Sequence, residues 1–260
     1  MICRCSKSST ESGHFMKRIL VVISLGWLLF VGGCGVTKLD GMTPGQAFDN
    51  PQVAALVEAA VQGDINEIDR LVAKGTEVNS VAANGLTPLI WVLSTHRMDG
   101  AKRLLELGAN PNYIAPNGFS AMSLAAGGNR PAVLRLLLEH GGDPDLMGHD
   151  GHPLLHIAVL NMRWANMRML LEFGGNINIV RPSDHDTAAN IAAGLGQFDQ
   201  VVFMLDHGFN ADLQRLAKYV DMVRVPPGSE AEKWKQVAIS RLMAKGITFP
   251  AFVPNRNVIR

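Results

Sequence analysis

Apolar residues recur along the chain with the spacing of amphipathic helices, and many of these runs end at a glycine. In "RLLELG" (103–108) and "RLLLEHG" (135–141) the leucines fall on the inward face of the predicted helix. The glycine that follows is typical of a helix end, where a left-handed residue is needed. Five such ends, "KGTEVN", "LGANPN", "HGGDPD", "FGGNIN" and "HGFNAD", place their glycines 33, 33, 33 and 34 residues apart, at Gly75, Gly108, Gly141, Gly174 and Gly208.

A second series has the same period and precedes the first helix of each predicted pair. Its members are "NGLTPLIWVL", "NGFSAMSLAA", "DGHPLLHIAV" and "HDTAANIAAG". In the first, Thr87 supplies a hydroxyl that caps a helix, and Pro88 fits the first helical turn. Ser120 and Thr187 take the same capping place, and in the fourth unit His185 takes the glycine slot after a one-residue insertion.

Two interlocked periods over five units resemble the ankyrin repeat, whose pattern runs G-x-T-P-L-H-x-A-A and then L-L-x-x-G-A-D-V-N. The resemblance covers residues 50–249 and implies an all-α ankyrin-repeat solenoid with divergent terminal caps, because one helical pair cannot bury its apolar faces alone. It places an opening cap at 50–79, repeats at 80–112, 113–145, 146–178 and 179–212, a closing cap at 213–250 and a tail at 251–260.

The closing cap lacks the Thr-Pro turn, and the sequence predicts two helices separated by "PPG" (226–228). Ser229 and Glu232 have the spacing of a capping box at the start of the second helix. We expect that helix to carry Trp234, Val237, Ala238 and Leu242 on one face and to stop at Gly246.

The N-terminal residues 1–33 carry a different pattern. Met16, Lys17 and Arg18 precede an apolar run from Ile19 to Val31, which makes about 20 Å of helix and is too short to cross a membrane. A basic start and small residues at the end are typical of a secretory signal. The ending "VGGC" (31–34) resembles the lipobox of bacterial lipoproteins, which implies cleavage before Cys34 and its acylation. A core-helix fragment or an ordinary signal peptide is the alternative.

The resemblance to lipoproteins also implies a compartment. We expect residues 34–49 to be a lipidated cysteine and spacer, and Gly35 after the cysteine resembles the sorting signal of cargo for the outer membrane on its periplasmic side. Cys3, Cys5 and Cys34 are the chain's three cysteines, so no disulfide can form after the acylation site. A formal charge of +1 gives no basic field for nucleic acid.

The stretch "GHDGHPLLHIAV" (148–159) raises the question of a metal site, because His152 and His156 stand four residues apart. In the ankyrin resemblance, however, His156 falls on the family's own histidine position, which implies a hydrogen bond to backbone between adjacent repeats. We therefore prefer repeat structure to metal. A weaker metal constellation combines the hairpin residues His149, His152, His185 and Asp186.

We find no nucleophile motif, phosphate-binding glycine loop or free cysteine in the repeat region, so we expect neither an enzyme nor a cofactor. The resemblance offers instead a groove formed by hairpins and first helices, and an apolar stripe there marks a protein interface. Local packing between hairpins is the alternative. The predicted partner-binding residues are Val81, Leu86, Ile114, Pro116, Phe119, Met147, His149, His152, Leu160, Val180 and Leu195.

The order of lipobox, spacer, ankyrin units and closing segment resembles the ankyrin lipoproteins that act as immunity proteins against type VI secreted phospholipase effectors. This resemblance implies a lipid-anchored protein, monomeric when unbound, that inhibits a lipase toxin at the membrane. The alternative is a periplasmic scaffold or chaperone for an envelope enzyme or complex. An enzyme that uses the histidine cluster ranks last.

The lipobox predicts that Cys34→Ser releases the protein from membranes, because the variant lacks the thiol that is acylated. Fractionation of cells that express each form measures this. Wild-type protein is expected in the membrane pellet and the variant in the soluble fraction. A variant that still pellets with membranes shows that Cys34 is not the anchor.

Overall fold

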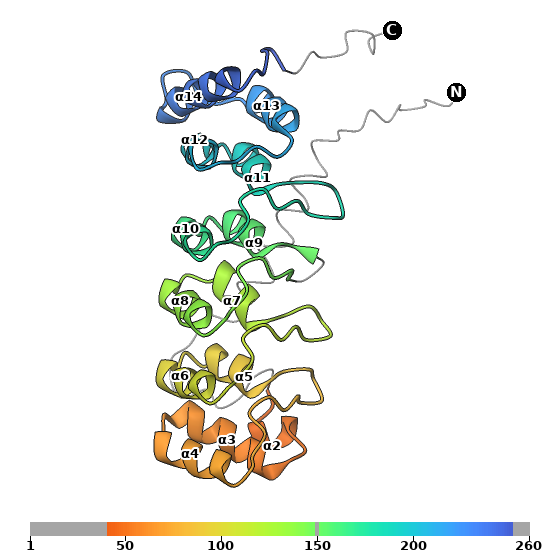
Figure 1. Ribbon diagram of the computed structural model, residues 1–260, viewed down its shortest axis with the longest axis vertical. Coiled ribbons are helices and arrows are strands. Elements are labelled where there is room, and N and C mark those ends of the chain that lie inside the picture. Colours follow the sequence, from red (N-terminus) through yellow and green to blue (C-terminus); the bar gives the residue numbers. More distant parts are fainter. Residues whose placement is uncertain (1–40, 149–150, 252–260) are drawn as a thin grey trace, which may run out of the picture. The chain divides into compact units, whose positions relative to one another are not determined.

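A computed structural model describes residues 41–148 and 151–251, and the signal segment, Cys34, His149 and the tail lie outside these ranges. All described residues belong to one compact unit, Thr37–Arg260. Within them every regular element is a helix, and successive helical pairs stack in a row (Figure 1). The helices are α2 (Pro44–Ala47), α3 (Pro51–Gln62), α4 (Ile65–Ala73), α5 (Pro88–Ser94), α6 (Met98–Glu106), α7 (Ala121–Gly127), α8 (Pro131–Glu139), α9 (Leu154–Leu160), α10 (Trp164–Glu172), α11 (Ala188–Gly194), α12 (Phe198–Asp206), α13 (Leu213–Met222) and α14 (Glu230–Ala244).

The first helix of each repeat begins where the hydroxyl-bearing residues predicted it. The hydroxyl oxygen of Thr87 accepts a hydrogen bond from the backbone of Ile90, and Ser120 and Thr187 make the equivalent bond in their repeats. Pro153 takes this place in the third repeat and provides no side-chain cap for α9. The repeat glycines close the second helices in the left-handed conformation, as at Gly108 with a φ of 90°.

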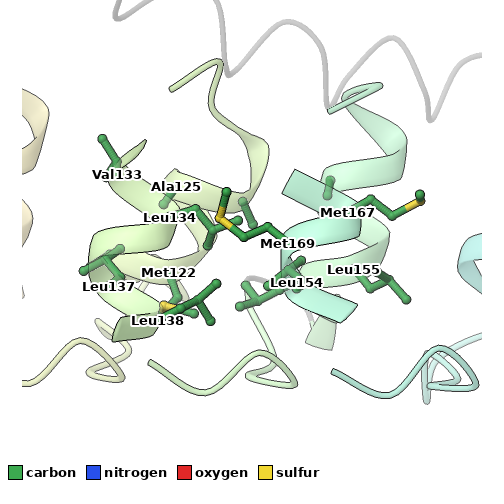
Figure 2. Packing of buried hydrophobic residues seen from close by; sticks show 14 of the residues in the cluster. Met122, Ala125, Val133, Leu134, Leu137, Leu138, Leu154, Leu155, Met167 and Met169 are labelled. Atoms are coloured by element: carbon green, nitrogen blue, oxygen red, sulfur yellow. The ribbon is translucent and has the colours of Figure 1, made fainter. Parts of the chain in front are cut away.

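The core is continuous between neighbouring pairs, because each pair covers the apolar face of the next. Figure 2 shows Met122 of α7 and Leu134 and Leu137 of α8 near Leu154 of α9 and the methionines of α10. The side chains of Met122, Leu137 and Leu154 are fully buried. Such a core predicts that each repeat depends on its neighbours for stability.

A ladder of side-chain amides joins the loops of adjacent repeats at a 33-residue spacing. Asn112 Nδ2 donates to the carbonyl of Gly141 at 2.8 Å, and Asn112 Oδ1 accepts from the backbone N–H of Asp143 at 2.7 Å. Asn79 and Asn178 make the same pair of bonds to the repeats that follow them. Asp145 accepts from the N–H of Asn176 in the same way, but a carboxylate has no N–H to donate.

The packed domain begins before residue 50, inside the segment assigned to the spacer. The short helix α2 lies at one end of the row (Figure 1), and Phe48 follows it directly in the chain. Ala47 and Phe48 are buried, and the Phe48 ring centroid lies 5.9 Å from that of Trp91. Proline and glycine in "TPGQAF" led to the spacer assignment, although Thr43 and Gln46 have the spacing of a capping box and Pro44 fits the first helical position.

At the other end, α13 and α14 close the row, which confirms the predicted helical pair. The hydroxyl of Ser229 accepts from the N–H of Glu232, as the capping box predicts. Ala238 and Leu242 on the predicted face are buried, whereas Trp234 on the same face is 37% exposed. Trp234 lies one turn before Ala238, near the start of α14, where the burial of this face ends.

The ladder predicts a graded loss of stability at one position. Asn112→Ala removes both hydrogen bonds and is expected to lower the free energy of unfolding by about 2 kcal/mol, since each contributes about 1 kcal/mol. Asn112→Asp retains the acceptor, as Asp145 does, and is expected to fall between the alanine variant and wild type. Urea denaturation measures both, and equal stabilities for all three proteins would show that the ladder contributes nothing.

Candidate functional site

The candidate site is the row of hairpins that precede the first helices, all of which project to the same side of the helices (Figure 1). Each hairpin is closed by one backbone hydrogen bond at an equivalent place, such as Ala115 N–H to Phe119 O at 2.7 Å. Gly148 to His152 and Arg181 to Asp186 repeat this bond in the next two repeats. The hairpins therefore present equivalent side chains at a regular spacing along the row.

The first of these positions is apolar in every repeat and is occupied by Val81, Ile114, Met147 and Val180. Val81 is 51% exposed and Ile114 is 41% exposed, whereas Met147 and Val180 are half-buried. Phe119, on the returning side of the second hairpin, is 40% exposed, and Pro116 beside it is also exposed. These side chains give repeats one to three an accessible apolar surface, which fits the predicted stripe.

Leu86 does not belong to this surface, and its assignment there is wrong. It occupies the same hairpin position as Phe119, but it is only 9% exposed and forms part of the core. The N-terminal segment packs on the first repeat beside this hairpin, whereas among the described residues no backbone hydrogen bond joins that segment to the second hairpin. Ala83 at this hairpin donates its N–H to the carbonyl of Ala47, and Phe48 lies against Trp91.

Two further predicted residues, Leu160 and Leu195, are half-buried and pack against the core. Leu160 is the last residue of α9 and Leu195 is the residue after α11, and at these helix ends the local-packing alternative fits better than an open surface. His149 lies outside the described residues. Leu124 on α7 is 36% exposed, and the sequence did not indicate this. The equivalent positions in two other repeats hold Trp91 and Ile191, which are both buried.

The polar end of the row is an ion-pair cluster centred on Arg181, which the sequence reasoning did not single out. Its Nε donates to Asp184 Oδ1 at 2.8 Å, and its Nη1 lies 3.0 Å from His152 Nδ1. Its Nη2 is 3.8 Å from a carboxylate oxygen of Asp186. The backbone carbonyls of Asp184 and His185 accept from Arg215. The guanidinium of Arg181 therefore occupies the place among His152 and Asp186 where the weaker hypothesis would put a metal ion.

Burial and neighbouring charges shift the pKa values of Asp184 and Asp186 in opposite directions. Burial alone would raise the pKa of Asp184, but hydrogen bonds from Arg181 and from the N–H of Asp186 hold that pKa below its usual value. Burial raises the pKa of Asp186 above its usual value, against the opposing effect of Asn190 and the N–H of Thr187. Within residues 41–148 and 151–251 no three His, Cys, Asp or Glu side chains converge as metal ligands.

His156 answers the question raised by the histidine spacing, and the prediction from the repeat is confirmed. Its ring is fully buried, and Nε2 lies 3.2 Å from the carbonyl of Ile179 in the next repeat. Burial lowers the pKa of His156 to about 4, so the ring is neutral at pH 7. The neutral imidazole donates to Ile179 and joins the third and fourth repeats.

Asn166 on α10 is a second buried polar residue that joins repeats, and sequence reasoning missed it. Its Nδ2 lies 3.0 Å, 3.0 Å and 2.9 Å from the carbonyl oxygens of Ala125, Ala126 and Gly128 at the end of α7. The signal available was a lone asparagine among the apolar residues of "WANMRMLL" (164–171). This contact supports the first helix of the second repeat, whose hairpin carries Phe119.

Comparison with known proteins agrees with this geometry. Residues 56–148 match a family model described as "Ankyrin repeats (3 copies)". The human ASB11 ankyrin repeat domain, known from a crystal structure, superposes with a TM-score of 0.51 at 24% sequence identity, covering 70% of this chain and 96% of that chain. The fold is an ankyrin-repeat solenoid. No curated protein matches the chain.

Ankyrin repeats indicate a protein-binding scaffold, and the fold is typically non-catalytic. The accessible apolar hairpins of this ankyrin solenoid fit that role. No helix among the described residues is both long and apolar enough to span a membrane.

The buried His156 predicts a dependence of stability on pH. Because its pKa is lower in the folded than in the unfolded protein, the unfolded chain binds the proton first as the pH falls below about 6.5. The stability that His156 contributes is therefore complete above that pH and is lost as the pH falls toward about 4. Between pH 7 and pH 5 the expected loss is about 2 kcal/mol.

Urea denaturation of wild type and His156→Asn at the two pH values isolates this loss, because asparagine already occupies the equivalent position at Asn190. The raised pKa of Asp186 acts in the opposite direction but is common to both proteins. The variant is expected to lose less stability than wild type on acidification. An equal loss in both proteins would mean that His156 does not titrate in this range.

Proposed function

We propose that the protein is a lipid-anchored immunity protein that binds and inhibits a secreted phospholipase toxin at the membrane. The observation that carries the binding role is the accessible apolar surface of the hairpins. Apolar side chains such as Ile114, Phe119 and Met147, grouped at neighbouring hairpins, are typical of an interaction site and not of a surface that contacts only water. The lipobox-like segment and Cys34 support the anchor, and Gly35 after the cysteine supports a periplasmic location at the outer membrane.

The centre of the proposed partner surface is the second and third hairpins. Phe119 supplies an exposed aromatic side chain, Met147 an adaptable apolar one, and His152 with Arg181 a polar border. Aromatic residues, methionine and arginine are enriched at the cores of protein interfaces, and polar groups commonly surround them. A surface of this composition suits a partner with its own apolar patch.

The proposed target follows from the proposed lipid anchor and from an inhibitory role that requires binding alone. A lipase that attacks phospholipid works at the membrane surface, so an inhibitor is most effective when it is held there. Stoichiometric binding over the catalytic opening or the lipid-docking surface of such an enzyme would stop it. The resemblance of the whole chain plan to type VI immunity lipoproteins supports this choice of partner.

The test uses the tagged mature chain to capture its partner from a lysate of the same organism. Mass spectrometry then identifies the captured protein. We expect one stoichiometric lipase-like protein whose activity falls when it is bound. Phe119→Asp combined with Met147→Asp is expected to abolish capture, because two buried carboxylates at the interface cannot be paired. The far-UV spectrum and melting temperature should change little.

The matched control is Met222→Asp combined with Met243→Asp, since both methionines are exposed and lie on α13 and α14. This control should still capture the partner. Capture of a resident envelope enzyme would favour the scaffold role over immunity. A growth defect of the deletion strain in the absence of any toxin would do the same. Unfolding of the Phe119/Met147 double variant would place those residues in the core.

A further inference from the structure

The second hairpin and the helix that follows it form an accessible apolar area. Ile114 lies at the base of this hairpin, where it pairs with Ser120, and it is 41% exposed. Phe119 directly precedes Ser120 and is 40% exposed. Leu124, whose N–H donates to the carbonyl of Ser120, is 36% exposed on α7. Three exposed apolar side chains therefore gather around one residue.

The first hairpin extends this area. A Cβ atom at Gly85 would lie 2.6 Å from Cδ of Pro116, so the glycine lets the second hairpin pack directly against the first. Val81, at the base of the first hairpin, is 51% exposed. Residues 78–95 and 107–129 contain no Asp, Glu, Lys or Arg. The first two hairpins thus form an uncharged half of the row, which can leave water without stripping a charge of its hydration.

The third and fourth hairpins, with the loops that precede them, form an acidic half of the row. Their charged side chains among the described residues are Asp143, Asp145, Arg181, Asp184 and Asp186. The side chain of Arg181 is only 13% exposed, whereas that of Asp184, which it contacts, is 43% exposed. Arg215, which borders the fourth hairpin, is paired with Asp212 at 3.5 Å. The charge that this half presents to a partner is therefore negative.

Asp145 carries a negative charge that the fold does not require. Other repeats place asparagine at this position of the amide ladder, as at Asn112 and Asn178, and gain a bond from Nδ2 to the next loop. Asp145 makes only the acceptor bond, to the N–H of Asn176. The repeat gives up a hydrogen bond where it gains a carboxylate, and such departures from a local rule are expected at functional sites.

The turns of the first two hairpins carry no long side chain that could enter a catalytic pocket. Ala83 and Pro116 are small. The Oδ1 atoms of Asn84 and Asn117 accept hydrogen bonds from the backbone N–H two residues later. Turns of this kind suit contact with a broad face of a partner better than insertion into an active site.

An apolar area beside an acidic one has the surface chemistry of an anionic bilayer, which presents acyl chains together with negatively charged headgroups. Proteins that dock on such a bilayer expose apolar side chains flanked by Lys or Arg. The two halves of the hairpin row complement both parts of a docking face of that kind.

We propose that the hairpin row binds the lipid-docking face of the phospholipase, an apolar face bordered by Lys and Arg, and so takes the place of the lipid. This inference rests on the proposed function and specifies its mechanism. The bound enzyme cannot adsorb to phospholipid, while its catalytic residues stay open to small substrates in solution. The acidic half speeds and orients the encounter, and the uncharged half supplies the buried contact.

The test compares two substrates of the captured phospholipase, each with and without a saturating amount of the mature chain. That chain carries Cys34→Ser, so that no anchor brings the complex to lipid. One substrate is vesicles of phosphatidylethanolamine and phosphatidylglycerol, to which the enzyme must adsorb. The other is a short-chain phosphatidylcholine kept too dilute to form micelles. We expect vesicle hydrolysis and co-sedimentation of the enzyme with vesicles to be lost, and hydrolysis of the dissolved substrate to be unchanged.

Asp143→Asn combined with Asp145→Asn removes two charges from the acidic half and gives both positions the residue that other repeats use. We expect association with the phospholipase to slow by about tenfold at low salt and to depend less on salt, because these charges steer the encounter. The free energy of unfolding should not fall, since Asp145→Asn restores a donor to the ladder. The control, Asp99→Asn combined with Asp199→Asn, removes the same charge from the first turns of α6 and α12 and should associate like wild type.

The outcomes separate this inference from the proposed function. Equal loss of activity on both substrates would place the contact over the catalytic opening and overturn the inference, while the immunity role would stand. Unchanged association of the Asp143/Asp145 variant would refute the basic border of the partner. Binding of the Cys34→Ser chain to vesicles without the phospholipase would mean that the hairpin row itself contacts lipid. Full activity of the bound enzyme on both substrates would refute the immunity role and the inference together.

Discussion

The structure depends on burial between neighbouring helical pairs, because no pair can cover its own apolar face. Met122, Leu137 and Leu154 are removed from water only where adjacent repeats meet. The amide ladder that includes Asn112 sets the register of this stacking, since each amide bonds to backbone of the next repeat. The regular spacing of the hairpins, and hence of the proposed surface, follows from that register.

Buried polar residues refine the stacking at particular repeats. His156 and Asn166 each cross from one repeat to its neighbour and donate hydrogen bonds to backbone carbonyls there. Both lie in the third repeat, next to the hairpins of Phe119 and Met147. The centre of the proposed partner surface is therefore supported by specific hydrogen bonds as well as by apolar packing, which favours a preformed binding surface.

Much of the fold was predictable because the repeat uses local signals. Helix ends at Gly108, caps at Thr87 and the bond from His156 depend on residues within one repeat or in the next. The closing pair was also predicted, since the capping box at Ser229 needs only four residues. The surface was harder. Leu86 and Phe119 occupy equivalent hairpin positions, yet one is core and the other is exposed.

The sequence by itself determined the period, the helical pairs and the apolar hairpin positions, because these arise from short-range propensity and spacing. Only the tertiary structure decided which of those positions remain accessible. Phe48 and α2 pack on the first repeat although residue 48 is far from Leu86 in the chain. Arg181 likewise becomes the centre of a polar cluster only when His152 and Asp184 are brought to it. Exposure depends on what packs from outside the repeat, and no local pattern encodes that.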